Sequence, residues 1–198
     1  IALPCGLQAD VSVENRLGAR KSAILAWHVL HGHPALGAAM AVMKSWAKRR
    51  GVYGQSHGFP SGLGFSCLVV FAAQRLAPAA CGICNWKEIG DVAPVQQVYA
   101  QRGWQKELLP ELAQLLRGIY GFYAEDFHWT RDLVSITPCN GGALAMRSAG
   151  VLRIQDPVQN ELDLAQPYMD KARSDQLRQE IQDAFQQLRD HRYADFLD

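Results

Sequence analysis

The stretch MKSWAKRRG, residues 43–51, decides the fold in our interpretation, because it combines a helical apolar pattern with two lysines one turn apart. Residues 33–50 predict a helix, and Lys44 and Lys48 therefore project from the same face of it. Two ammonium groups in this arrangement can bind the far end of a polyphosphate. The same spacing is also typical of a solvated helix face, which is the alternative interpretation.

An acidic residue precedes this region. Asp10 begins a short alternating segment, residues 11–15 (VSVEN), which predicts a strand. A carboxylate at the start of a strand can hold a divalent metal ion. Phosphoryl or nucleotidyl transfer needs a metal-binding carboxylate and cations that hold the phosphates, so Asp10 with Lys44 and Lys48 points to that chemistry.

Composition narrows the class of protein. The chain has 198 residues, 48% hydrophobic and 20% charged, which predicts one folded domain or a domain with part of another. The formal charge of +1 excludes a global basic field, so any basic surface is local. The longest apolar stretch, residues 62–73, is too short for a membrane span, and we expect a soluble protein without a membrane partner.

Five cysteines, with Cys67 in an apolar helix, predict reduced thiols in an intracellular compartment, either mitochondrial or cytoplasmic.

The apolar periodicity predicts mostly helical structure. Helices are expected over residues 19–31, 33–50, 62–77 and 110–127, with Ser61 as the N-cap of the third, and over a C-terminal stretch with Ser174 as its N-cap. Two strands, residues 133–136 and 151–154, predict a hairpin or an adjacent ribbon, while residues 79–103 predict a long excursion with at most short helices. The expected fold class is α+β, mostly helical, with a strand remnant at the start.

Two further clusters have alternative interpretations. Cys81 and Cys84 have the spacing of half a zinc site, although a surface turn is the favoured interpretation. His28, His31 and His33 could bind a metal, and we favour the interpretation that they cap the last carbonyls of a helix. No Ser-His-Asp or Cys-His arrangement stands out, and hydrolase chemistry is set aside.

Several stretches together resemble the RNA terminal uridylyltransferases and non-canonical poly(A) polymerases of the polymerase β nucleotidyltransferase superfamily. DVSVENRLG, residues 10–18, resembles their strand with the third metal-binding aspartate and a ribose-contacting asparagine, and KSWAKRRG, residues 44–51, is similar to their triphosphate-binding helix. SGLG, residues 61–64, stands where a serine, a tyrosine and a glycine precede an apolar helix. FYAEDF at 122–127 and IQDP at 154–157 resemble the poly(A)-polymerase-associated region and the nucleotide-recognition loop.

The resemblance implies a division of the chain and a reaction. Residues 1–17 would be a remnant of the catalytic palm, and residues 18–198 a helical central, nucleotide-recognition domain. In that family two metal ions, Mg²⁺ or Mn²⁺, activate the RNA 3′-hydroxyl for in-line attack on the α-phosphate of a nucleoside triphosphate. By resemblance, Asp10 is the catalytic metal ligand, and the nucleotide-binding residues are Asn15, Lys44, Lys48, Ser61, Leu63 and Asp156.

Within that group the resemblance implies separate roles. Asn15 would contact the ribose, Lys44 and Lys48 would hold the β and γ phosphates, and Asp156 would read the base edge. Departures from the family pattern gather on one side of the expected pocket: Leu63 replaces a base-stacking tyrosine, and Gly62, Gln159 and Gln166 replace a serine, a glutamate and a basic residue. The nine residues before Asp10 include no acidic residue, so the first two aspartates of the family's metal site are not present in them.

Two functional hypotheses follow. The first is an RNA 3′-terminal nucleotidyltransferase, or the nucleotide-binding half of one, that transfers UMP from UTP, or AMP from ATP, to an RNA 3′ end. The second is a catalytically degenerate relative that acts as a structural or RNA-binding subunit of a larger ribonucleoprotein assembly. The missing acidic pair and the departures around Leu63 are what motivate the second hypothesis.

Overall fold

The computed structural model of the chain describes residues 15–78, 108–137, 150–166, 168–192 and 195–196. The helices are α1 (Arg16–His31), α2 (Leu36–Arg49), α3 (Gly62–Leu76), α5 (Leu109–Gly121) and α6 (Lys171–Arg189). They are joined by a short 3₁₀ turn, η1 (Gln55–His57), a π-helical turn, η3 (Phe122–Asp126), and two strands, β1 (Leu133–Val134) and β2 (Arg153–Ile154). The predicted fold class, α+β and mostly helical, is confirmed.

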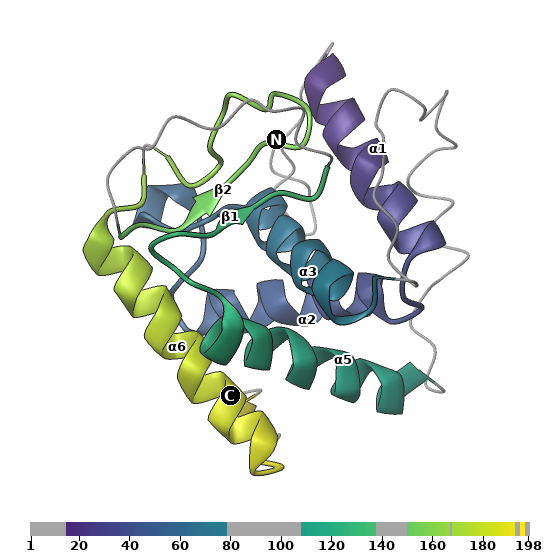
Figure 1. Ribbon diagram of the computed structural model, residues 1–198, viewed down its shortest axis with the longest axis vertical. Helices are drawn as coiled ribbons and strands as arrows, with labels where there is room; N and C mark the ends of the chain where they lie inside the picture. The colour runs from purple at the N-terminus through teal and green to yellow at the C-terminus, as the bar shows by residue number, and fades with distance from the viewer. Residues whose placement is uncertain (1–14, 79–107, 138–149, 167, 193–194, 197–198) are drawn as a thin grey trace, which may run out of the picture.

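Helix α3 lies at the centre of the molecule, with α2, α5 and both strands packed against it (Figure 1). Every residue from Gly64 to Ala73 is buried. A helix that is apolar on all sides has no face to offer to water, so it must be covered on all sides. The one hydroxyl in this stretch, Ser66 Oγ, donates to the Gly62 carbonyl at 2.9 Å and is thereby satisfied. The predicted buried helix with Ser61 as its N-cap is confirmed.

Helices α1 and α2 correspond to the helices predicted over residues 19–31 and 33–50, and they contact each other. Helix α1 begins three residues before its predicted start, because the Asn15 side chain accepts a hydrogen bond from the Gly18 amide at 2.8 Å and caps the first turn. Pro34 separates the two helices. The inner face of α2 then packs into the core through Leu36, Ala39, Met40, Met43, Trp46 and Ala47.

The two strands pair in parallel, with Leu133 opposite Arg153 and Val134 opposite Ile154. The prediction of a hairpin is therefore wrong, and the alternative, a ribbon of two adjacent strands, is correct. Parallel pairing needs a crossover connection, and residues 135–152 are long enough to supply one. The strand pair lies against the first half of α3, where a Cβ on Gly64 would be 3.5 Å from Ile154 Cδ1.

The N-cap of α6 is Asp170, whose carboxylate accepts from the Arg173 amide at 2.8 Å. The prediction that Ser174 caps this helix is wrong. Ser174 is buried inside the first turn, and its hydroxyl accepts from the Leu152 amide at 3.0 Å, because that amide precedes β2 and needs an acceptor. The predicted C-terminal helix itself is confirmed, and it packs into the core through buried Leu177 and Ile181.

Helix α5 does not continue as an α-helix to residue 127. Its last predicted turn widens into η3, where the Phe127 amide donates to the Phe122 carbonyl at 2.9 Å. The widened turn leaves the Tyr123 carbonyl to accept from Trp129 Nε1 at 2.9 Å, while the Tyr123 hydroxyl donates to the Leu68 carbonyl of α3 at 2.8 Å. The turn thus ties a buried aromatic cluster to the central helix.

Several predictions concern residues outside the described ranges. These are the strand over residues 11–15, apart from Asn15 itself, and Asp10, the Cys81 and Cys84 pair, and the excursion over residues 79–103. They stay predictions. Among the described helices, none is both long enough and apolar enough to cross a membrane.

The His28 side chain is buried in the core, and its predicted capping role is wrong. Only 1% of the residue is exposed, and the last turn of α1 is closed by the Gly32 amide, which donates to the His28 carbonyl at 2.8 Å. His33 Nδ1 accepts from the Ala35 amide at 3.2 Å. Burial lowers the pKa of His28 from 6.5 to about 4, an effect that the nearby Ile136 backbone only partly opposes.

This buried histidine makes stability depend on pH. The unfolded chain protonates His28 near pH 6.5 and the folded chain only near pH 4, so stability is complete at neutral pH and falls as the pH falls between those values. The expected contribution is about 3 kcal/mol in the free energy of unfolding by pH 4. Urea unfolding of the wild type and of His28→Gln, measured from pH 7 to pH 4, should show a shallower decline in the variant. His57→Gln, which changes an exposed histidine, is the control, and equal slopes for wild type and His28→Gln would refute this account.

Candidate nucleotide site

Two lysines of α2 bring positive charge together. Lys44 is half-buried, and its pKa is lowered first by burial and second by the charge of Lys48. Within the described part of the chain neither lysine forms an ion pair. A desolvated ammonium next to a second one is unfavourable unless an anion joins them. The predicted placement of both lysines on one face is confirmed, and the cluster is suited to an anionic group.

The first turn of α3 lies beside these lysines. A Cβ placed on Gly62 would be 3.7 Å from Lys44 Cδ, so the lysine stem packs on the start of the helix. Ser61 caps that turn, with its hydroxyl accepting from the Gly64 amide at 3.5 Å. The amides of a helix N-terminus carry partial positive charge and add to that of the lysines. Leu63 is half-buried and packs against the core, so its side chain contributes apolar area.

Sequence reasoning missed Tyr53, which lies between the two helices. Its ring stacks on that of Phe65, with centroids 5.7 Å apart and planes 14° apart, and Lys48 Nζ lies 5.0 Å from its centroid. An ammonium over an aromatic ring is held by the ring quadrupole. Tyr53 follows the end of α2 in a glycine-containing loop without periodicity, so nothing in the local sequence marks it as part of the site.

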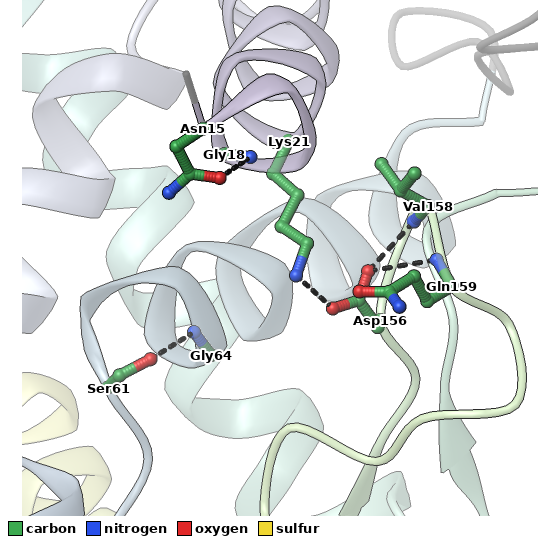
Figure 2. A network of polar contacts seen from close by, with 8 residues as sticks. All are labelled: Asn15, Gly18, Lys21, Ser61, Gly64, Asp156, Val158 and Gln159. Carbon is green, nitrogen blue, oxygen red and sulfur yellow. Dashed lines mark hydrogen bonds and ion pairs between the residues drawn. The ribbon is translucent and has the colours of Figure 1, made fainter. Parts of the chain in front are cut away.

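The second half of the candidate site is a buried ion pair (Figure 2). Asp156 is fully buried, and its Oδ1 accepts from the amides of Val158 and Gln159 at 2.9 and 3.1 Å. Its Oδ2 lies 2.5 Å from Lys21 Nζ, which reaches across from α1. Both carboxylate oxygens are therefore engaged within the protein. The Lys21 side chain is 20% exposed and that of Asp156 only 1%, so Lys21 is the member of the pair that reaches solvent.

Sequence reasoning also missed Lys21, although a signal was available. Lys21 lies three residues before Ile24 and seven before His28, and both of these are buried. A charged residue on the buried face of a helix requires a partner, because burying an isolated ammonium is costly. The pattern thus marks Lys21 as a paired residue, but only the tertiary structure shows that the partner is Asp156.

Asp156 also lies close to the second turn of α3. Burial raises the pKa of the Cys67 thiol to about 12, the negative charge of Asp156 adds to that shift, and Lys21 opposes it. Cys67 is free and buried, so the prediction of a reduced thiol holds for this cysteine. Asn15 lies at the start of α1, where its side-chain oxygen accepts from the Gly18 amide (Figure 2).

The structure describes six of the seven predicted site residues, and five of them lie around the first half of α3. Lys44, Lys48, Ser61 and Leu63 lie at the α2–α3 junction, and Asn15 and Asp156 lie toward α1. Asp10 is outside the described residues. Among the described residues, no group of three or more His, Cys, Asp or Glu could hold a metal ion.

A groove of about 530 Å³ is lined by the loop between α2 and α3 and by residues at the start of α6. Its polar lining includes His57, Tyr168 and Arg173, and the Arg173 guanidinium lies 5.4 Å from the Phe59 ring centroid. None of the six described site residues lines this groove. It is therefore separate from the lysine cluster.

The arrangement of the buried α3, the parallel strand pair and α2 resembles the fold of solved terminal uridylyltransferase structures. This chain is similar to solved structures of RNA editing TUTase 1 from Trypanosoma brucei, with a TM-score of 0.72 and 20% sequence identity over 86% of the chain. The structures of that protein in complex with UTP and with the UTP analogue UMPNPP give TM-scores of 0.73 and 0.72 at 19% and 20% identity, over 86% and 88% of this chain. The chain spans 40% of the length of each. No protein-family model matches the chain, and no curated protein matches it by sequence.

The buried ion pair has a testable consequence for stability. Lys21→Met leaves the buried Asp156 carboxylate with only its two backbone donors, and we expect a loss of about 3 kcal/mol in the free energy of unfolding. The double variant Lys21→Met/Asp156→Asn removes the uncompensated charge while an amide oxygen remains for the two backbone amides. It should therefore be more stable than Lys21→Met alone. A double variant that is less stable than the single one, by urea unfolding, would contradict this assessment of the pair.

Proposed function

We propose that this chain binds the triphosphate of a nucleoside triphosphate on Lys44 and Lys48, as the nucleotide-recognition half of an RNA 3′-terminal nucleotidyltransferase. The observation that carries the proposal is the half-buried Lys44 beside Lys48, two charges without a described carboxylate partner. A bound polyphosphate would supply the missing negative charge, and its oxygens would accept charge-assisted hydrogen bonds from both ammonium groups. The likeness in fold to a protein solved with UTP supports a nucleotide as the ligand.

Uracil is the proposed base, because the similar solved structures contain UTP and a UTP analogue. Base recognition in this chain would involve Lys21 as well as Asp156, since the ammonium lies against the carboxylate. Ammonium protons are donors, so they suit the carbonyl oxygens of uracil. The acceptor of the transferred nucleotide would be an RNA 3′ end, and the reaction would need Mg²⁺ or Mn²⁺ on acidic residues that include Asp10.

The second candidate function is a non-catalytic subunit of a ribonucleoprotein assembly. It is favoured by two features of the base side of the site: Leu63 offers no aromatic face, and both oxygens of Asp156 are engaged by Lys21, Val158 and Gln159. A site of this kind could keep its fold without binding a nucleotide. The two candidates differ in whether the folded chain binds a triphosphate.

Calorimetric titration separates the two candidates. We expect the 198-residue chain, in buffer with magnesium, to bind UTP more tightly than ATP, CTP or GTP. The double variant Lys44→Ala/Lys48→Ala should bind UTP about a hundredfold more weakly, because it loses two charge-assisted phosphate contacts.

The matched control for this titration removes two positive charges elsewhere. Arg49→Ala/Lys171→Ala changes exposed residues, one on α2 beside the site and one on α6, and should bind UTP like the wild type. A folded wild-type chain that binds none of the four nucleotides would reject the first candidate and leave the structural subunit.

The lowered pKa of Lys44 predicts how nucleotide affinity depends on pH. Lys44 loses its proton at a lower pH than an ordinary lysine, whose pKa is 10.5, and the neutral amine no longer attracts phosphate. UTP affinity should therefore decline as the pH rises toward 10.5, before an ordinary lysine would lose its charge. Lys44→Arg keeps its charge throughout and should flatten this decline. Titrations of both proteins from pH 7 to pH 10 test the effect, and parallel profiles would exclude Lys44 as its source.

A further inference from the structure

The Tyr53 hydroxyl occupies the space that a side chain at position 62 would fill. A Cβ placed on Gly62 would lie 2.8 Å from Tyr53 Oη, a distance that real Cβ atoms do not tolerate. Gly62 is the first residue of α3, so the hydroxyl lies directly over the N-terminal turn of the central helix. The absence of a side chain at position 62 is therefore what allows Tyr53 to reach this point.

The hydroxyl is available for a ligand. Within the described part of the chain it makes no hydrogen bond, and Tyr53 itself is only partly buried. The ring is held on Phe65, and the charge of Lys48 lies over it at 5.0 Å. The same Gly62 Cβ position is 3.7 Å from Lys44 Cδ. The hydroxyl thus lies within the lysine cluster, on a ring whose orientation is fixed by packing.

We propose that the Tyr53 hydroxyl is a phosphate-binding group of this site, supplied by the loop between α2 and α3 to a helix turn that has no side chain at its first position. The inference rests on the proposed function and adds a residue to it. A phenolic O–H donates to a phosphate oxygen, and beside Lys44 and Lys48 that oxygen carries negative charge, so the hydrogen bond is charge-assisted.

The position of the hydroxyl predicts which part of the ligand it contacts. Because the donor lies beside the two lysines, it should contact the phosphates and leave the base and ribose untouched. The contribution of the hydroxyl to the binding free energy should therefore be equal for UTP and for inorganic tripolyphosphate, which has no base or ribose. A donor to the base would affect UTP alone.

The first measurement is calorimetric titration of Tyr53→Phe with UTP and with tripolyphosphate, in buffer with magnesium. We expect both affinities to fall by a similar factor of about ten, the loss typical of one hydrogen bond to a charged group. The thermal unfolding midpoint should stay at the wild-type value, because the ring and its packing on Phe65 remain. Tyr168→Phe, which removes the hydroxyl of an exposed tyrosine outside the cluster, is the matched control and should change neither affinity.

A second pair of variants tests the steric coupling. Gly62→Ser in the wild-type background forces the phenol oxygen away and should weaken binding of both ligands. In the Tyr53→Phe background the closest remaining ring atom, Cζ, is 3.9 Å from the new Cβ, an ordinary contact. The introduced serine then fits and offers a hydroxyl near the same place, so Tyr53→Phe/Gly62→Ser should bind more tightly than either single variant.

The outcomes separate this inference from the proposed function. Loss of binding in Lys44→Ala/Lys48→Ala without loss in Tyr53→Phe overturns the role of Tyr53 and leaves the lysine site standing. A Tyr53→Phe chain that is weakened for UTP and not for tripolyphosphate overturns it as well, as does a double variant no better than the single ones. A folded wild-type chain that binds neither ligand overturns both proposals.

Discussion

Helix α3 is buried on every side along most of its length, and the arrangement of the whole molecule depends on that constraint. Ten consecutive buried residues leave no face toward water, so α2, α5 and the strand pair must enclose the helix. Its first turn, at Gly62 and Leu63, is only half-buried. The stem of Lys44 from α2 and the hydroxyl of Tyr53 from the loop between α2 and α3 meet at this turn.

The two charged groups beside α3 are handled in different ways. Asp156 is fully buried and satisfied, with Lys21 on one oxygen and two backbone amides on the other. Such a pair holds α1 to the loop after β2, because removing either member would leave an uncompensated charge. Lys44 and Lys48 have no such partner among the described residues. The charges around Asp156 are thus paired within the protein, whereas the positive charge of the two lysines is available to an anion.

Tyr53 and Gly62 illustrate how the loss of one side chain can make room for another. Gly62 removes a Cβ from the first turn of α3, and the phenol of a loop residue nine positions earlier takes that space. Phe65, one turn further along α3, fixes the ring from below by stacking. The position of the phenol therefore depends on the absence of a side chain at position 62.

Much of the fold could be predicted from local pattern. The apolar run after Ser61, the lysines four apart in α2 and the inward face of α6 all follow from spacing, because helical periodicity acts over a few residues. The N-cap of α6 was predicted wrongly, because two nearby residues are equally suitable for that position. Asp170 and Ser174 are both good N-caps, and the choice between them was made by the Leu152 amide, which needed the serine.

The sequence by itself determined the helices, their inward faces and the lysine pair, since each depends on neighbours within a turn or two. Only the tertiary structure decided the parallel strand pairing, the burial of His28, and the partners of Lys21 and Tyr53. The physical reason is that these contacts join segments dozens of positions apart or cross between elements. Their energies come from burial and charge pairing, which exist only after the chain has packed around α3.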